Sequence, residues 1–313
     1  MKHLFYLLSL FVLSACASSE DGDTDNPNLP GPLQTGRQVS EIVMRYTSYD
    51  VPAHDTKVVF HYDADGRVSR MDLTNTSPSE DVEQSGQFDF SYEGNVVTCE
   101  ASYNYDGEYT KTELNGILGD QSQLLAGSVK EYYFDGETET FVEEISESIQ
   151  YEVIYDALGY MSSTTCFYNA DTDAGIPARE KNYQLSWENG NPTELMWGTR
   201  GDDYWVLDCA EYGNVQNKTN LDLSWLLLTT EGWSFMVGDP SNFFGLAGYY
   251  GNRSRTMPVK TYYRSPASSN DPIYSFAQIT YQLDDEGYIE EITEKYVGSD
   301  YEETTVYTIS YRN

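Results

Sequence analysis

Histidine is the side chain that most often supplies a general base or a metal ligand near neutral pH, and this sequence has few. Of the three histidines, His3 lies in the apolar N-terminal segment, which leaves His54 and His61 for chemistry. No HExxH, CxxC, Walker or GxSxG motif accompanies them. The sequence therefore gives no support to a histidine-based nucleophile or a zinc mechanism, and both side chains are expected on the surface or in hairpins.

Pairs of carboxylates are the second source of chemistry, because two acids flanking a glycosidic bond can hydrolyse it. The chain holds 51 Asp and Glu residues. With so many acids, some pair lies at a suitable separation in any fold, so their abundance identifies no site. An acid-pair glycoside hydrolase is kept as an alternative, while the sequence favours a protein without enzymatic activity and without a cofactor.

One loop has the ligand spacing of a calcium site. Asn169, Asp171, Asp173 and Glu180 stand at positions 1, 3, 5 and 12 of an EF-hand-like loop. However, Ala174 replaces the glycine of the sharp turn, and the flanking sequences are strand-like rather than helical. An acidic turn without a metal is therefore the favoured interpretation, and calcium ligation is the alternative.

Three tryptophans are the candidates for ligand binding. Trp187, Trp197 and Trp205 each share strand parity with a nearby leucine. Aromatic rings in a groove can stack on a sugar, whereas rings that alternate with leucine more often pack inward. Core packing is the favoured interpretation of all three, and a ligand groove is the alternative.

The clearest chemical signal lies at the N-terminus. A basic start is followed by an apolar run at residues 4–13, which is shorter than the roughly 20 residues that span a bilayer and is typical of a signal peptide. The next sequence, Leu-Ser-Ala-Cys, ends at Cys16 and matches the lipobox of bacterial lipoproteins, where the cysteine thiol is acylated and becomes the new N-terminus. We expect a signal peptide at residues 1–15 and a membrane anchor at Cys16.

Residues 16–38 are expected to form a flexible tether, because they are acidic and then rich in proline and glycine. The acidic cluster directly after the cysteine resembles a surface-export signal of some Gram-negative gut anaerobes. This favours an outer-membrane lipoprotein exposed at the cell surface, with a periplasm-facing position as the alternative.

The net charge of −33 excludes nucleic acid as a probable class of partner, because a polyanion requires a basic face. A solvated, colloidally stable surface is the simplest interpretation of the charge. The expected partners are therefore the membrane, through the lipid on Cys16, and either a ligand such as a glycan or an envelope protein.

The elements that position these residues are predicted to be β-hairpins. Runs of alternating polar and apolar residues end in turns, and three of these turns share the pattern Asp-x-x-Gly, at residues 63–66, 156–159 and 284–287. Asp starts such a turn and Gly supplies the positive φ that closes it. We expect residues 39–313 to form a single all-β domain, an antiparallel meander curled into an open or closed barrel.

One region breaks the alternation. Leu221, Trp225 and Leu228 follow helical spacing, and residues 241–250 are apolar enough for a second short helix ending near a glycine. We expect these segments to pack against one end or the interior of the sheet. The internal cysteines, which are Cys99, Cys166 and Cys209, are expected to be buried free thiols, with one disulfide plus a spare thiol as the alternative.

The layout of residues 40–313 resembles a family of lipoproteins of gut Gram-negative bacteria with a porin-like fold and unknown function. The resemblance is carried by the aromatic-acid-glycine hairpins, by Asn-Lys-Thr-Asn-Leu-Asp-Leu at 217–223, by Phe-Gly-Leu-Ala-Gly at 244–248 with Arg-Ser at 253–254 and Met-Pro-Val at 257–259, and by the closing Asp-Glu-Gly-Tyr-Ile hairpin within 284–289. It implies a curled antiparallel sheet and an envelope location, but no activity and no functional residues.

From these observations we expect a membrane-anchored envelope lipoprotein that binds a ligand, such as a glycan, without catalysis. The alternative is a structural or interaction subunit of an outer-membrane complex. An exposed aromatic row in a cleft would favour the first, an exposed apolar patch or open sheet edge the second, and two facing carboxylates at the base of a cleft would favour the hydrolase.

Overall fold

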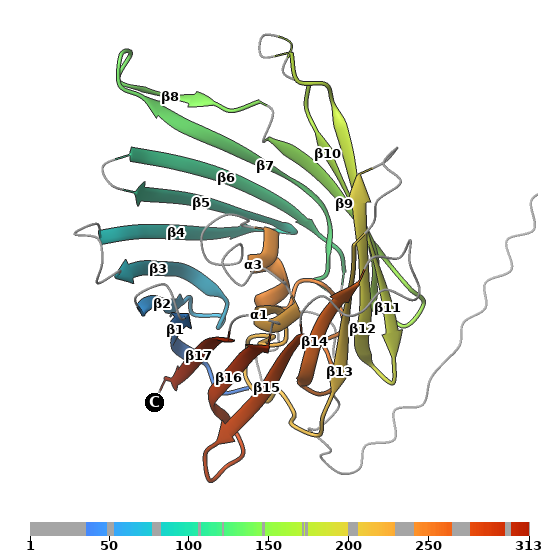
Figure 1. The fold of residues 1–313 in the computed structure, drawn as a ribbon. Helices are drawn as coiled ribbons and strands as arrows, with labels where there is room; N and C mark the ends of the chain where they lie inside the picture. Colours follow the sequence, from blue (N-terminus) through green and yellow to red (C-terminus); the bar gives the residue numbers. More distant parts are fainter. Residues whose placement is uncertain are drawn as a thin grey trace, which may run out of the picture.

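The computed structural model describes residues 36–48, 53–76, 83–105, 108–120, 122–145, 148–170, 172, 175–199, 206–228, 241–264, 276–297 and 302–312. Most of them belong to one antiparallel sheet of 17 strands (Figure 1). The strands are β1 (Val39–Ser48), β2 (His54–Tyr62), β3 (Val68–Thr76), β4 (Glu83–Glu93), β5 (Val96–Tyr105), β6 (Glu108–Leu118), β7 (Leu124–Asp135), β8 (Thr140–Glu143), β9 (Ile149–Tyr155), β10 (Met161–Tyr168), β11 (Arg179–Glu188), β12 (Asn191–Thr199), β13 (Val206–Tyr212), β14 (Pro258–Arg264), β15 (Phe276–Leu283), β16 (Ile289–Val297) and β17 (Glu302–Tyr311).

The sheet curls into a barrel, as the sequence predicted. Each strand pairs with the next along the chain, and β17 pairs back with β1 from Val39↔Tyr311 to Ser48↔Glu303. The short strand β8 is the exception. It pairs with the end of β7, whereas the ring continues from the start of β7 directly to β9. The strand neighbours that complete the barrel are therefore the first and the last in the sequence.

The three Asp-x-x-Gly turns fold alike, which confirms the hairpin prediction. In each turn one carboxylate oxygen of the aspartate accepts the backbone N–H groups two and four residues later, at 2.9 and 2.9 Å for Asp63, 2.9 and 2.9 Å for Asp156 and 2.9 and 2.8 Å for Asp284. The glycine follows with φ of 79°, 84° and 81°. Side chain and glycine together close the backbone tightly enough for adjacent strands to pair.

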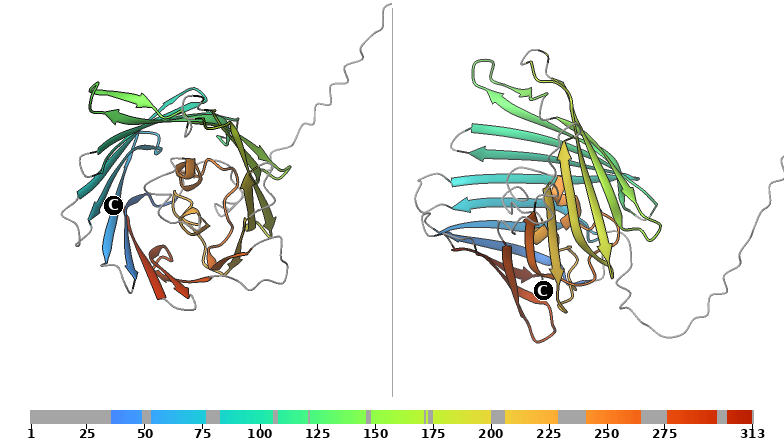
Figure 2. Two further views of the ribbon diagram at one scale, coloured as in Figure 1. Left: turned by 45° about the horizontal axis from the view of Figure 1, so that its top comes forward. Right: turned by 45° about the vertical axis from the view of Figure 1, so that its right-hand side comes forward.

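A plug fills the inside of the barrel (Figure 2). It is formed by the described parts of the connection between β13 and β14, residues 213–228 and 241–257, which include helices α1 (Trp225–Leu228) and α3 (Ser241–Leu246). Leu223, Phe244 and Leu246 are fully buried there. The expected interior packing of this apolar segment is thus confirmed.

The first helix is shorter than the apolar spacing predicted, whereas the second begins at Ser241 and ends near Gly248, as expected. Before α1, residues 220–222 are not helical, because the backbone N–H of Asn220 bonds to the carbonyl of Arg37 at 3.2 Å and that of Asp222 to the carbonyl of Leu246 at 2.7 Å. These long-range bonds replace the local bonds that a longer helix would need. The second helix ends before Gly248, whose φ is 81°.

Hydrogen bonds attach the plug to one end of the barrel, which we call the turn end because the Asp-x-x-Gly turns lie there. The carbonyl of Tyr249 accepts the N–H of Leu124 at 2.8 Å, and the carbonyl of Gly159 accepts that of Asn252 at 2.9 Å. The N–H of Arg255 bonds to Gly190 at 2.9 Å. Bonds to several hairpins fix the plug against the wall.

The outer face of the wall is polar. Ion pairs join neighbouring strands, for example Lys57 with Glu41, and Arg45 Nε with Asp55 Oδ1 at 3.1 Å. Glu152 on β9 is among the exposed acids of the same face. A lipid-facing barrel wall carries apolar side chains at such positions, so this surface is suited to water. Within the described ranges, no helix is long and apolar enough to cross a membrane.

Two of the internal cysteines can be placed. Cys99 and Cys166 are both buried and unbridged, as expected. Burial also raises the pKa of the Cys99 thiol far above its ordinary value. The side chain of Cys209 lies outside the described residues, so the expectation for it stays a prediction.

Candidate functional site

The described histidine lies on the outer face rather than in a cleft. His61 is exposed on β2, and its Nε2 lies 2.8 Å from Asp72 Oδ2 on the neighbouring strand. This is a cross-strand surface pair. The backbone of His54 belongs to the same strand, and its side chain lies outside the described residues.

Part of the calcium candidate can be described. Asn169 is exposed and its amide donates to the main-chain carbonyl of Ser148 at 3.4 Å, while Glu180 accepts a bond from a neighbouring asparagine at 3.1 Å. Asp171 and Asp173 lie outside the described residues. Among the residues that are described, no group of three or more His, Cys, Asp and Glu could hold a metal. Calcium ligation remains a prediction of the sequence.

The three tryptophans cannot be assembled into one platform from the described residues. Trp187 is half-buried at the turn end of β11, where its indole N–H donates to the carbonyl of Met161 at 2.7 Å and its ring lies 4.6 Å from that of Tyr160. The backbone of Trp197 lies toward the other end of the paired strand β12. The Trp197 side chain and the whole of Trp205 lie outside the described residues, as does Cys16.

A polar pocket opens at the turn end, between the plug and the β2–β3, β4–β5 and β6–β7 turns. Its volume is about 290 Å³, close to the lower end of the ~300–1,000 Å³ of ordinary ligand sites. The lining residues are Asp65, Arg67, Tyr92, Gly94, Leu118, Ser122 and Tyr249. We call this the turn-end pocket.

Arg67 is the best-fixed charge in the turn-end pocket. Its guanidinium bonds to Asp63 Oδ2 at 2.8 and 2.7 Å, pairs with Asp65 at 3.1 Å and lies 4.2 Å from the centre of the Tyr92 ring. Burial opposes the charge, but the two carboxylates outweigh it and raise the pKa of Arg67. The guanidinium is therefore held in one orientation, ready to donate to a ligand without further ordering.

Two tyrosines join the wall of the pocket to the plug. The hydroxyl of Tyr92 donates to the carbonyl of Val68 at 2.7 Å and contacts the hydroxyl of Tyr249. Burial raises the pKa of Tyr249 to about 12, so this hydroxyl is neutral at any physiological pH. The pair supplies uncharged hydroxyls beside the charged Arg67.

The charges in and beside the pocket favour some classes of ligand over others. Asp63 and Asp65 outnumber Arg67, which leaves a local excess of one negative charge. A phosphate or carboxylate ligand would meet that excess, whereas a neutral polyhydroxylated ligand could use both the acceptors and the donors. Ser122 at the rim adds a further hydroxyl, and its φ of 61° is unusual for a residue other than glycine.

A second feature of the interior is a buried carboxylate. Glu294 on β16 points into the barrel and is 3% exposed. Its Oε2 lies 3.4 Å from the hydroxyl of Tyr307, while its Oε1 has no hydrogen-bond partner among the described residues. Burial, opposed by bonds from Tyr296 and Tyr307, raises the pKa of Glu294 to about 7. One buried carboxylate differs from the facing pair that hydrolysis requires.

The plug contains two buried groups of opposite charge type, Arg253 and Asp222. Arg253 donates to the carbonyls of Thr219, at 2.9 Å, and of Asn220. Asp222 accepts the hydroxyl of Ser224 at 2.6 Å. Burial lowers the pKa of Arg253 to about 10, against the opposing effect of Asp222. Burial likewise raises the pKa of Asp222, and the Arg253 charge opposes that rise.

Sequence reasoning missed the turn-end pocket. The sequence places Asp65 and Arg67 in or next to a predicted hairpin turn, but Tyr249, which completes the pocket, lies far along the chain in the plug. The sequence at residues 63–67 predicts a turn. Its spacing does not indicate which side chains of the plug lie beside that turn. Arg253 enters the sequence analysis only through the family resemblance, because nothing in its local spacing indicates that its side chain is buried among backbone carbonyls.

Comparisons with known proteins support the fold alone. No protein-family model matches the chain, and no curated protein matches its sequence. Among solved structures, the chain is similar to a porin-like protein from Bacteroides vulgatus, with a TM-score of 0.58 and 15% identity over 88% of this chain and 99% of that one. A porin-like protein from Bacteroides uniformis gives a TM-score of 0.54, with the same identity and coverage. The chain thus has a porin-like barrel fold.

Proposed function

We propose that this protein is a non-enzymatic binding protein of the bacterial envelope that takes a neutral, polyhydroxylated ligand, such as a short glycan, in the turn-end pocket. The observation that carries the proposal is the Arg67 guanidinium, which is fixed between two carboxylates and the Tyr92 ring at the wall of a 290 Å³ pocket. Rigid donors and acceptors around a small volume favour a ligand with many hydroxyls.

The lipid on Cys16 is the proposed anchor. The lipobox and the acidic, proline-rich segment after it support an outer-membrane lipoprotein, with surface exposure favoured over the periplasmic side. The charged outer face of the barrel supports a domain that lies in water and is held to the membrane by acyl chains. Metabolic labelling with an alkyne fatty acid should label the parent but not the variant Cys16→Ala, and a parent without label would refute the anchor.

The binding test begins with a glycan-array screen of the full-length lipidated protein in detergent micelles, followed by calorimetric titration of each glycan that binds. Asp65→Asn removes an exposed acceptor charge without changing side-chain shape. A hydrogen bond to a charged group contributes about 1.5–3 kcal/mol, so we expect affinity to fall by roughly tenfold or more.

The matched control is Glu286→Gln, because Glu286 occupies the same position in the 284–287 turn and lies outside the turn-end pocket. We expect this variant to bind like the parent. Equal loss in both variants, or no binding across a broad array, would refute the pocket as a glycan site.

A further inference from the structure

The β7–β8 hairpin extends beyond the ring at the end opposite the turn end. β7 pairs with β9 only through residues 126–129, and its later residues pair with β8 from Tyr132↔Glu143 to Asp135↔Thr140. In the described part of the chain β8 pairs with β7 alone, and Figure 1 shows β8 along the upper margin of the molecule. The hairpin therefore presents an open sheet edge.

Three aromatic side chains cross the outer face of this hairpin. Tyr109, Phe134 and Phe141 lie on neighbouring strands with ring centroids 6.5 and 5.5 Å apart, and they are 50%, 41% and 45% exposed. The next position of this row would lie on a strand added beside β8. Cross-strand aromatic contacts stabilise sheets, so that position favours an aromatic or apolar residue.

The direction of the free backbone groups can be derived. The N–H of Glu144 donates to the carbonyl of Glu131 on β7 at 2.7 Å. Alternate residues of a strand point the same way, so Val142 also faces β7, while the N–H and C=O groups of Phe141 and Glu143 face the free edge. These are the groups that an added strand would pair with.

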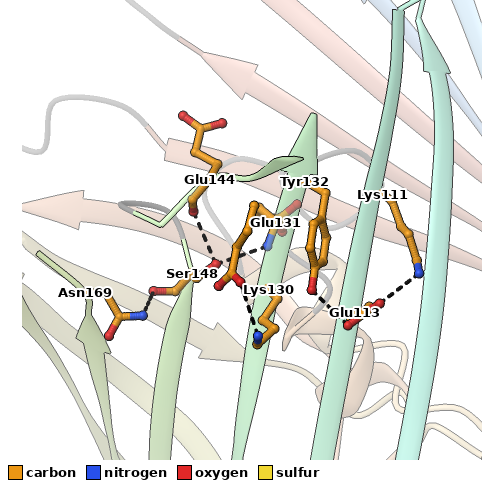
Figure 3. A network of polar contacts seen from close by, with 9 residues as sticks. Lys111, Glu113, Lys130, Glu131, Tyr132, Glu144, Ser148 and Asn169 are labelled. Atoms are coloured by element: carbon orange, nitrogen blue, oxygen red, sulfur yellow. Dashed lines mark hydrogen bonds and ion pairs between the residues drawn. The ribbon is translucent and has the colours of Figure 1, made fainter. Parts of the chain in front are cut away.

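The acidic charge of the hairpin indicates which kind of segment can pair with it. Residues 135–144 contain five acids and no base. Lys130 contacts Glu143 at 3.2 Å and offsets one of these acids, while Lys111 is paired with Glu113 at 2.8 Å, so the hairpin keeps an excess of negative charge. Figure 3 shows Lys111 and Tyr132 converging on Glu113 on this face. The edge is therefore complementary to a basic segment.

We propose that the free edge of β8 binds an extended, basic segment of a partner protein by strand addition. Phe141 and Glu143 share one face, so the partner should place an aromatic residue beside Phe141 and a Lys or Arg beside Glu143. In an antiparallel arrangement the partner reads basic-x-aromatic from its N-terminus. This surface is separate from the turn-end pocket and from the function proposed for it.

Two other occupants fit less well. A second copy of this chain would bring its own five acids against the same five, which is repulsive. A glycan stacks on a flat ring face, whereas the rings of Tyr109, Phe134 and Phe141 meet edge to face, with interplanar angles of 75° and 68°. The geometry and charge both favour a polypeptide strand.

The test uses the full-length protein in detergent micelles and a fluorescent peptide, Thr-Lys-Thr-Phe-Thr-Val-Thr, with a second peptide in which Glu replaces Lys. Fluorescence anisotropy should show that the Lys peptide binds more tightly. The variant Glu143→Lys should reverse this preference, with each peptide changing roughly threefold to fivefold. Phe141→Ala should weaken both peptides alike.

Matched controls lie elsewhere on the outer face. Phe167→Ala removes an exposed aromatic residue from β10 and Glu290→Lys reverses an exposed charge on β16, and neither should alter binding. Hydrogen exchange should slow at the amides of Phe141 and Glu143 when the Lys peptide binds. Protection only at other sites, or the same preference in Glu143→Lys as in the parent, would overturn the proposal. A doubled mass that Phe141→Ala abolishes would assign the edge to a second copy instead.

Discussion

Replacing the buried carboxylate by its neutral isostere, Glu294→Gln, should remove a pH dependence of stability. The folded-state pKa of Glu294 is raised by burial from 4.5 to about 7. Between these two values the folded protein keeps a proton that the unfolded chain has released. The free energy of unfolding therefore falls as pH rises through this window.

The size of the effect follows from the difference between the two pKa values. At about 1.4 kcal/mol for each pKa unit, the rise from 4.5 to about 7 corresponds to a loss of about 3 kcal/mol between pH 4.5 and pH 7 and above. Glutamine resembles the protonated carboxyl in shape and carries no charge. We expect Glu294→Gln to match the parent near pH 4.5 and to be more stable by up to about 3 kcal/mol at pH 8.

Urea unfolding followed by intrinsic fluorescence at pH 4.5, 6 and 8 measures this difference. Subtracting parent from variant at each pH removes the contribution of every other acid. The uncharged neighbour Ile292 is a control, because Ile292→Val should cost about 1 kcal/mol at each pH. If the free energies of unfolding of variant and parent differ by the same amount at pH 4.5 and pH 8, Glu294 is not a buried, protonated group.

Three further outcomes are expected. Arg253→Met should lower the free energy of unfolding by about 3–5 kcal/mol, since it removes the charged donor of the buried carbonyls of Thr219 and Asn220 and the positive charge that acts on Asp222. A variant that matches the parent in urea unfolding would contradict this. Gly251→Ala should cost clearly more than Gly94→Ala, although both glycines have positive φ, because a Cβ at Gly251 would overlap the carbonyl oxygen of Gly159 while that at Gly94 meets nothing within 4 Å. Equal melting temperatures of the two variants would contradict this. Cys99 and Cys166 should resist a maleimide reagent until urea unfolds the chain, and site-resolved mass spectrometry that finds rapid native labelling would disprove their burial.

The hairpins could be predicted because their cause is local. Each Asp-x-x-Gly turn is held by the aspartate and glycine within it, as at Asp63 and Gly66, so five residues of sequence contain the whole interaction. Strand alternation then sets which side chains face inward. The barrel class follows from many such hairpins in series.

The plug and the pocket depend on contacts that sequence spacing does not encode. The predicted helix around Leu221 to Leu228 begins only at Trp225, because Asn220 and Asp222 bond to Arg37 and Leu246 instead of to their own helix. In the same way, Tyr92 and Tyr249 meet only because the plug folds back to the β4–β5 turn. A single sequence without aligned relatives carries no sign of these pairings.

The pairing of β1 with β17 has a consequence for how the molecule folds. β1 leaves the ribosome first, yet one of its edges stays unpaired until the last strand is made. Contacts between the two ends of a chain carry a high loop-closure cost and slow folding. The newly made protein therefore carries an unpaired strand edge until β17 is in place, and during that time the edge is open to pairing with other chains.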